Sequence, residues 1–314
     1  MNTYDVVIGI DTSNYTTSVA LLSLGGELIA NIKRPLPVRQ GECGLRQSDA
    51  VFSHVKNMPL CMAEAREYLK GKRVISVGVS QKPRNVEDSY MPCFLSGVAV
   101  AEGISACMDI PLHRFSHQCG HIAATLYSSG NEQMLSSSFG AFHISGGTTE
   151  LLRVSPDEDG FIAECVGGSS DLNAGQAIDR IGVAMGLSFP CGRELEALAL
   201  QNTKRIPRRS VKERDMQISL SGLENLALKL YIETNDKQLV SAFVLDYIYS
   251  GISALADAYI KKYGEGRLIF SGGVMSNSII KARLMQKYDS AFAEPALSAD
   301  NAVGIAFLTS LKYR

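Results

Sequence analysis

The sequence predicts an α/β protein made of two halves that share one design. Apolar runs typical of buried strands alternate with longer segments of helical periodicity along the 314 residues. One order of elements, an apolar strand, a hydroxyl- or glycine-rich turn and a returning strand, begins near the N-terminus and begins again roughly 135 residues later. The length also corresponds to about two domains of roughly 150 residues each. We therefore expect an internal duplication of a unit that starts with a β-hairpin.

The first half opens with this hairpin. "YDVVIGID" predicts a buried strand, "TSNYTT" a polar turn and "SVALLSL" the returning strand. Apolar residues at helical spacing then predict a helix, and "SGN" ends the last helix of this half. In chain order we expect strands over 4–11, 18–24 and 27–36, a helix over 48–69, a strand over 73–80, a helix after Pro92, an extended segment over 110–115 and a helix over 117–128.

The second half repeats the opening pattern. "GAFHIS" predicts a strand, "GGTT" a tight turn and "ELLRVS" a returning strand, followed by the strand "GFIAECVG". A long amphipathic helix over 239–263 comes next, and then a strand, a glycine turn and a helix over 267–285. The final helix, over 298–313, is led by Asp300 and Asn301.

The composition is that of a globular protein without a global charge. The hydrophobic fraction is 46%, the charged fraction is 20% and the formal net charge is −1, so any RNA contact needs a local basic patch. The loop "KRIPRRSVKERD" over 204–215 is a candidate for such a patch, and a solvated charged loop without an RNA contact is the alternative. Seven cysteines without a C-x-x-C pair, a start unlike a signal peptide and no long uncharged apolar run lead us to expect a cytoplasmic protein without a membrane span.

The stretch "HRFSHQCGHIAATL" places three of the five histidines at intervals of four. His117 and His121 fall on one face of the expected helix, where two imidazoles can hold one metal ion. Ordinary polar side chains on a helix flank remain the alternative. His113 precedes the helix, and for it we expect a structural or surface role. A zinc peptidase would need Glu after the first histidine of the pair as its general base, and Gln118 stands there.

Three turns that follow apolar strands are candidate anion sites. Each alone is an ordinary turn, but glycines allow close backbone approach and a helix N-terminus favours negative charge. Together they suggest a nucleotide held between the two halves, without a P-loop or a Rossmann fingerprint. The residues concerned are Thr12, Ser13, Thr16 and Thr17 in the first turn, Gly146 and Gly147 in the second, and Gly272 and Gly273 in the third.

Seven motifs in this order resemble the universal tRNA threonylcarbamoyladenosine synthase family, also known as the O-sialoglycoprotein endopeptidase or glycoprotease family. They are "GIDTS", "HQCGH", "HISGGTTEL", "DLNAGQAIDRIGVAMGLSFPCG", "ISLSGLENLA", "FSGGVMSN" and "SADNAVGIAF", and they extend from about Val6 to about Leu308. The resemblance implies a duplicated actin-like, sugar-kinase-like (ASKHA, RNase H-like) two-lobe fold with a central cleft. We expect an N-terminal lobe over 1–112 and a C-terminal lobe over 113–314 with the metal and nucleotide motifs. The last helix is a candidate to pack back on the first lobe.

The resemblance also implies a metal site. His117 and His121 match the family's two metal-binding histidines, and Asp300 matches its carboxylate ligand. The implied metal is iron or zinc, and two histidines with a carboxylate and phosphate oxygens suit either ion. His143 stands where some members carry a tyrosine that reaches the metal. It is a further candidate ligand, with a half-buried strand histidine as the alternative.

The implied ligand is ATP, ADP, AMP or the threonylcarbamoyl-adenylate. Its phosphates are expected at the second glycine turn, its ribose at a carboxylate of the following helix and its adenosine near two later turns. The nucleotide-binding candidates are Ser145, Gly146, Gly147, Asp179, Gly192 and Asn277, together with Thr12 and Ser13 of the first turn.

The implied activity is transfer of a threonylcarbamoyl group from its adenylate to the N6 amine of a tRNA adenosine. Expected partners are tRNA, other proteins of the same modification pathway, and a second chain, identical or different, that pairs through helices. Two departures keep other functions open. Asn14, Tyr15 and Thr16 replace the family's acidic pair, and the segment 81–97 is longer and more charged than its counterpart. A non-catalytic nucleotide-binding partner protein and a carbamoyltransferase with another acceptor remain alternatives, and no catalytic residue is assigned.

Overall fold

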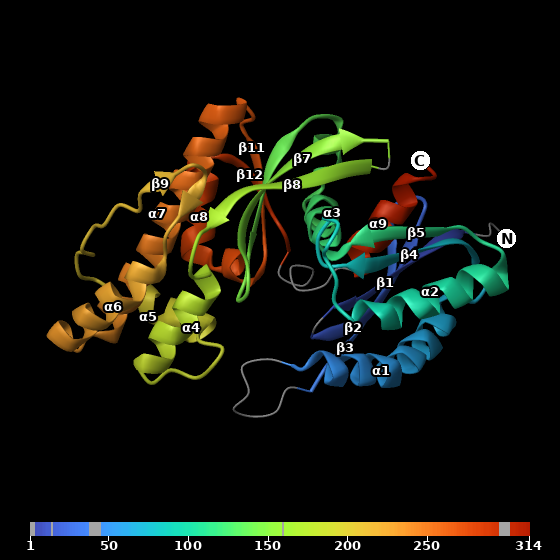
Figure 1. The fold of residues 1–314 in the computed structure, drawn as a ribbon, viewed down its shortest axis with the longest axis horizontal. Coiled ribbons are helices and arrows are strands. Elements are labelled where there is room, and N and C mark those ends of the chain that lie inside the picture. Colours follow the sequence, from blue (N-terminus) through green and yellow to red (C-terminus); the bar gives the residue numbers. More distant parts are fainter. Residues whose placement is uncertain (1–3, 14, 38–44, 159, 295–301) are drawn as a thin grey trace. The chain divides into compact units, whose positions relative to one another are not determined.

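A computed structural model describes residues 4–13, 15–37, 45–158, 160–294 and 302–314 (Figure 1). The chain divides into two compact units. The first unit comprises Met1–Glu132, Pro156–Ala163 and Ala296–Arg314, and the second comprises Gln133–Ser155 and Glu164–Pro295. Each unit contains its own sheet and its own hydrophobic core.

The first unit contains a five-stranded sheet and four helices within the described residues. Its elements are β1 (Asp5–Ser13), β2 (Thr16–Ser23), β3 (Leu28–Pro35), α1 (Gln47–Tyr68), β4 (Arg73–Lys82), α2 (Phe94–Met108), β5 (Leu112–Ser116), α3 (His117–Ser129) and α9 (Ala302–Leu311).

The second unit contains a seven-stranded sheet, with helices that are grouped around the long α7. Its elements are η1 (Glu132–Ser136), β6 (Phe139–Ile144), β7 (Thr149–Asp157), β8 (Gly160–Ser169), α4 (Ala174–Ala184), α5 (Gly192–Leu200), β9 (Glu213–Arg214), β10 (Gln217–Ile218), α6 (Ser221–Thr234), α7 (Lys237–Tyr263), β11 (Arg267–Ser271), η2 (Gly273–Ser276), α8 (Ser278–Lys287) and β12 (Asp289–Phe292). The first residues of β8 belong to the first unit.

The two sheets share one topology. The first has the strand order β3-β2-β1-β4-β5, and the second contains the matching order β8-β7-β6-β11-β12, extended by β10 and β9 beyond β8. In each, the first strand pairs antiparallel with its hairpin partner and parallel with a strand that follows a long crossover. The expected duplication of a hairpin-led unit is therefore present.

Strand β1 is buried on both faces by helices of the first unit. Gly97 of α2 lies against Ile10, while a Cβ on Gly9 would approach the Ala302 carbonyl of α9 to 2.2 Å. A strand that is covered on both sides reads as a continuous apolar run, and "VVIGI" is such a run. Asp11, the residue after Ile10, is therefore buried beneath helices and does not face solvent.

Helix α3 belongs to the first unit because it packs on α9. A Cβ on Gly304 of α9 would lie 1.9 Å from the Gly120 carbonyl oxygen of α3, so the two helix backbones are in direct contact. The last helix therefore packs on the first unit. The unit extends to Glu132 and not to residue 112, because the partner of α3 comes from the far end of the chain.

Helix α7 is long and apolar enough to cross a membrane by length and composition. Most of its apolar stretch is buried in the core of the second unit. Core helices of globular units commonly meet this description.

The contact between α3 and α9 makes a prediction about stability. We expect Gly304→Ala to lower the free energy of unfolding of the first unit by about 1–3 kcal/mol, because the added methyl group must displace the backbone of α3. The matched control is Gly103→Ala in α2, where a Cβ meets nothing within 4 Å, so the change should be neutral or stabilising. Thermal unfolding followed by circular dichroism checks both variants. Equal midpoints for Gly304→Ala and the parent protein would contradict the prediction.

Candidate functional site

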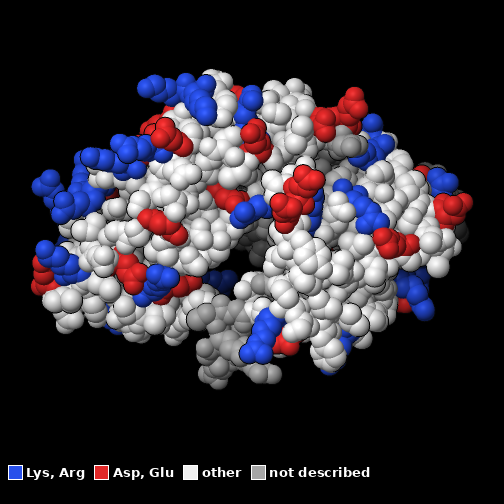
Figure 2. Space-filling view, viewed as in Figure 1, with Lys and Arg blue, Asp and Glu red and all other residues white. Residues whose placement is uncertain are grey.

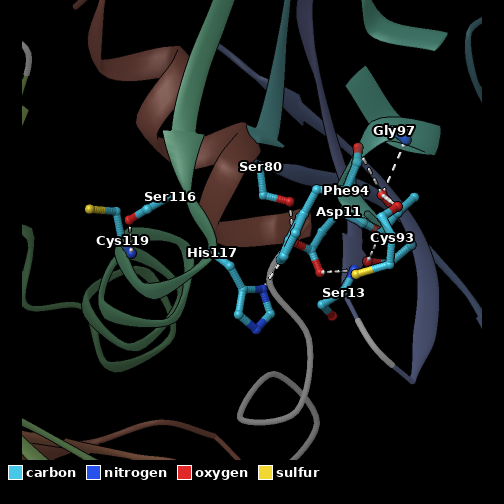
Figure 3. A network of polar contacts seen from close by, with 11 residues as sticks. Asp11, Ser13, Ser80, Cys93, Phe94, Gly97, Ser116, His117 and Cys119 are labelled. Carbon is cyan, nitrogen blue, oxygen red and sulfur yellow. Dashed lines mark hydrogen bonds and ion pairs between the residues drawn. The ribbon is translucent and has the colours of Figure 1, made fainter. Parts of the chain in front are cut away.

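A buried carboxylate lies at the end of β1 in the first unit (Figure 3). Asp11 is 1% exposed. Its Oδ1 lies 3.0 Å from Nδ1 of His117 and accepts a hydrogen bond from the Ser80 hydroxyl, and its Oδ2 accepts from the Ser13 backbone N–H at 3.3 Å. Burial by itself raises the pKa of Asp11, but the neighbouring His117 ring and these hydrogen bonds outweigh it and hold the pKa below its ordinary value. Both oxygens of Asp11 therefore act as hydrogen-bond acceptors.

The two histidines of α3 lie side by side, as their spacing predicts. The rings of His117 and His121 are 4.7 Å apart between centroids and stand nearly at right angles. Ser116 caps the helix by accepting from the Cys119 backbone N–H at 3.2 Å. The ring of Phe94 lies 5.7 Å from that of His117. The start of α3 is thus fixed by its own cap and by a residue of α2.

The donor set suits a transition metal but is incomplete within the part of the chain that the structure describes. No group of three or more His, Cys, Asp or Glu side chains is placed there to hold a metal ion. Asp300, the expected carboxylate ligand, lies outside the described residues. Zinc and iron sites in proteins commonly combine two histidines with one carboxylate. Figure 3 shows the His117 ring directing Nδ1 at Asp11 and its other nitrogen away from it.

The remaining histidines have other surroundings. His113 lies 3.3 Å from the Tyr313 hydroxyl and stacks on Phe115, in keeping with the structural role expected for it. His54 is fully buried and its Nδ1 lies 2.8 Å from the Thr17 hydroxyl. Burial lowers the pKa of His54, which the charge of Asp11 opposes, and the contact with Thr17 ties α1 to β2.

His143 belongs to the second unit and not to the unit that contains α3. Its Nδ1 lies 3.3 Å from the hydroxyl of Ser271, which is its register partner across the parallel strands β6 and β11. The half-buried strand environment expected as the alternative is present. A ligand role for His143 stays a hypothesis.

The first turn does not offer the hydroxyl that we expected from Thr12. That side chain is fully buried, donates to the Cys93 carbonyl at 3.0 Å and accepts from the Gly97 N–H at 3.1 Å. In this structure the Thr12 hydroxyl therefore joins the end of β1 to the start of α2 in the interior of the first unit through these two hydrogen bonds. Ser13 is half-buried, with its N–H on Asp11, and Asn14 lies outside the described residues.

In the second turn, Ser145–Gly147, both glycines are exposed and the backbone is held by hydrogen bonds. The Ser145 N–H donates to the Thr148 carbonyl at 2.8 Å, and the Asn173 amide donates to the Gly147 carbonyl at 2.9 Å. A Cβ on Gly146 or on Gly147 would meet nothing within 4 Å. The glycine backbone is therefore open to a ligand on a turn that is held in place from behind.

The third turn lies next to the second, at the ends of the parallel strands β6 and β11. Gly272 has φ +95°, and a Cβ there would lie 2.3 Å from the Ile144 carbonyl, so only glycine fits. Asn277 follows, 8% exposed, and caps α8 by accepting from the Ile280 N–H at 3.1 Å. The loops after neighbouring parallel strands are the usual ligand edge of such sheets.

The other nucleotide candidates lie on helices that pack at this edge. Asp179 of α4 accepts from the Cys191 N–H at 2.8 Å, just before α5 begins at Gly192. Burial raises the pKa of Asp179, which the hydrogen bond from Cys191 opposes. Glu196 of α5 accepts from the Ser278 N–H at 2.7 Å and so ties α5 to the start of α8. The turn Ser145–Gly147, Asp179, Gly192 and Asn277 are thus all carried by elements that contact one another in the second unit.

Sequence reasoning missed two residues of the first-unit site, Asp11 and Ser80. An acidic residue that directly follows the apolar run "VVIGI" was the available signal, since a charge at the end of a buried strand must find partners. Ser80, at the end of the parallel strand β4, carried no comparable signal. The rebuilt segment 81–97 also reaches the site, because the Pro83 carbonyl accepts from the Gln118 N–H of α3 at 3.0 Å.

Comparisons with solved structures agree on the fold. Full-length HypF in its phosphate- and nucleotide-bound form matches with a TM-score of 0.61 at 12% identity, over 99% of this chain and 55% of that one. Component A of (R)-2-hydroxyglutaryl-CoA dehydratase from Acidaminococcus fermentans matches with a TM-score of 0.56 at 12% identity, over 99% of both chains. A ROK family protein from Streptococcus pneumoniae matches with a TM-score of 0.54 at 11% identity, over 98% of both. The predicted duplicated actin-like, sugar-kinase-like fold is confirmed.

Comparisons of sequence identify the family. The TsaD family model, described as tRNA N6-adenosine threonylcarbamoyltransferase, matches residues 89–307. A protein of that name from Streptococcus gordonii is 30% identical, over 96% of this chain and 90% of its own length. Another, from Streptococcus equi subsp. zooepidemicus, is 29% identical over 98% and 91%. With a match over more than half of its residues and a relative of this similarity along nearly its whole length, the chain belongs to the tRNA N6-adenosine threonylcarbamoyltransferase family, a family of acyltransferases.

Proposed function

We propose that this protein transfers the threonylcarbamoyl group of threonylcarbamoyl-adenylate to the N6 amine of a tRNA adenosine, with a divalent metal at His117, His121 and Asp300. In this reaction N6 loses a proton and bonds to the carbamoyl carbon, while the bond from that carbon to the phosphate oxygen breaks and AMP leaves. The observation that carries the proposal is the pair of imidazoles 4.7 Å apart on one face of α3. A bound iron or zinc ion would supply Lewis-acid polarisation of an oxygen of the adenylate.

The second unit contributes the nucleotide grip in this proposal. The backbone of Gly146 and Gly147 is exposed and a Cβ at either position would meet no protein atom within 4 Å, so a phosphate can approach the turn closely. The N-terminus of α4 is already occupied by protein acceptors. The Ala174 N–H donates to Thr149 at 2.9 Å and the Gly175 N–H donates to the Ser145 carbonyl at 3.3 Å. Helix α4 therefore positions the turn, and the turn itself binds the anion.

A tRNA substrate needs basic surface, which the net charge of −1 does not supply globally. Figure 2 shows Lys and Arg side chains gathered over the part of the second unit where β9 and α7 lie. The segment between α5 and β10 carries six basic residues, of which Lys204 pairs with Asp236 at 2.7 Å. We propose this segment as a tRNA contact; its exposed arginines are Arg205, Arg208, Arg209 and Arg214.

The metal site is tested by exchanging histidines of one stretch. We expect His117→Ala and His121→Ala each to lose the bound metal and to reduce tRNA modification at least 10²-fold, because each removes a ligand that orients the adenylate. His113→Ala is the matched control and should keep both. Metal content by mass spectrometry, and modified adenosine formed from purified threonylcarbamoyl-adenylate, tRNA and pathway proteins, provide the measurements. Metal retained after both single changes, or no modification by the metal-loaded parent protein, would refute the proposal.

The nucleotide grip is tested by filling the open side of the turn. Gly146→Val should weaken adenine-nucleotide binding by at least 10-fold without lowering the thermal midpoint, since its side chain meets ligand space and not protein. Gly266→Val, at a loop position of the same unit that is equally open, is the control. Titration calorimetry with ADP and a non-hydrolysable ATP analogue checks this. If Gly146→Val keeps both its nucleotide affinity and its thermal midpoint, the phosphate does not bind at this turn.

The basic segment predicts a salt-dependent contact. Replacing Arg205, Arg208 and Arg209 together by alanine should weaken tRNA binding and reduce the slope of log K against log[salt] by about one for each lost phosphate contact. The control replaces Lys56, Arg66 and Lys72 of the first unit. Filter binding over a range of salt concentrations measures both slopes, and an equal reduction in the two triple variants would count against a specific contact.

A further inference from the structure

We infer that Asp11 is a positioning residue for His117: it holds the imidazole proton on Nδ1 and so presents the Nε2 lone pair as the metal-binding atom. The inference rests on the proposed metal role of His117. It concerns a residue that lies 106 positions earlier in the sequence and on a different element, the strand β1.

In its hydrogen bond with His117, the Asp11 carboxylate can only be the acceptor. An ionised carboxylate accepts hydrogen bonds and donates none, so Nδ1 of His117, 3.0 Å away, must be the donor. A neutral imidazole, the form that binds a metal, carries a single proton, so Nε2 is then the unprotonated nitrogen. Metal-binding histidines commonly make this contact through the ring nitrogen that does not bind the metal. The tautomer that Asp11 imposes is therefore the one that a ligand at Nε2 requires.

The orientation of Asp11 is fixed by partners on two sides. The hydroxyl of Ser80 donates to Oδ1, the oxygen that also faces His117, and the Ser13 N–H donates to Oδ2. Thr12, the next residue, is tied to the start of α2, whose Phe94 ring packs against His117. The carboxylate cannot rotate away without losing these contacts, so the ring plane of His117 is set by β1, β4 and α2 together.

An amide at this position cannot satisfy the same partners. Asn has one acceptor oxygen, whereas the site presents donors to both oxygens of Asp11: His117 and Ser80 at one, and the Ser13 N–H at the other. In Asp11→Asn, either the Ser13 N–H faces the NH₂ group, or the amide is flipped and His117 and Ser80 face it. The flipped amide donates to Nδ1 and favours the Nε2–H tautomer, so the single-tautomer preference of His117 should be lost. Loss of such an outer partner typically weakens metal binding 10–100-fold.

The matched control lies on the same strand. Asp5→Asn makes the same chemical change at the other end of β1, where the carboxylate pairs with Arg73 at 2.7 Å. It removes one negative charge, as Asp11→Asn does, but does not touch His117. Any effect of net charge or of strand stability alone should appear in both variants.

The experiment has two readouts on the full chain. The first is ¹⁵N NMR of the metal-free, histidine-labelled protein, with His117 assigned by His117→Gln. We expect Nδ1–H in the parent and in Asp5→Asn, and a mixture of tautomers in Asp11→Asn. The second is Zn²⁺ affinity by chelator competition, with Co²⁺ absorption as the check on coordination. We expect 10–100-fold weaker binding only in Asp11→Asn.

The outcomes separate this inference from the proposed function. If His117→Ala binds Zn²⁺ as tightly as the parent protein, the proposed metal site fails, while the tautomer readout still reports on the pair of Asp11 and His117. If Zn²⁺ binding needs His117 but Asp11→Asn keeps both the Nδ1–H tautomer and the affinity, the inference is overturned. An equal loss of affinity in Asp5→Asn and Asp11→Asn would also overturn it.

Discussion

The first unit is organised around one constraint, the burial of the Asp11 carboxylate. A buried charge without partners costs several kcal/mol, so the chain must bring donors to it, and it does so from separate elements. Ser80 comes from the parallel strand β4, His117 from the first turn of α3, and the Ser13 N–H from β1 itself. The contact that satisfies the charge also fixes the imidazole. Stability and the orientation of the His117 ring therefore depend on the same hydrogen bonds.

The frame that brings α3 to Asp11 depends on close backbone packing. Helix α9 touches β1 at Gly9, and its own Gly304 touches the Gly120 carbonyl of α3; neither Gly9 nor Gly304 has room for a Cβ. Since α9 packs on both the strand and the helix, these two close backbone contacts, and not long side chains, place the start of α3 relative to β1. Such packing is stiff, because a core resists both voids and overfilling. This stiffness is what lets a contact of 3.0 Å define the ring of His117.

Local signals in the sequence predicted more than long-range ones. The pairing of His117 with His121 follows from the helical period, and the duplicated hairpins follow from the alternation of apolar runs and turns. The first unit extends beyond the expected residue 112 because α3 packs on α9, near the far end of the chain. The hydroxyl-rich turn makes Thr12 a candidate anion ligand, but its hydroxyl is engaged within the protein. Its actual acceptor, the Cys93 carbonyl, is 81 residues away and unpredictable from the turn itself.

The duplication explains how one topology can serve two chemical tasks. At the ends of the central parallel strands, the first unit joins Asp11 and Ser80 across β1 and β4, and the second joins His143 and Ser271 across β6 and β11. The hydrogen-bonded pair is kept while its chemistry differs. After its pair, the second unit leaves an exposed glycine turn, whereas the first unit buries Thr12 and adds the imidazoles of α3. Exchanging Asp for His at the end of the first strand is enough to replace a carboxylate acceptor by an imidazole. The loop that follows this strand can then differ between the two units without disturbing the core. In the proposed enzyme this allows the metal ligands of α3 and the phosphate turn to be tuned separately.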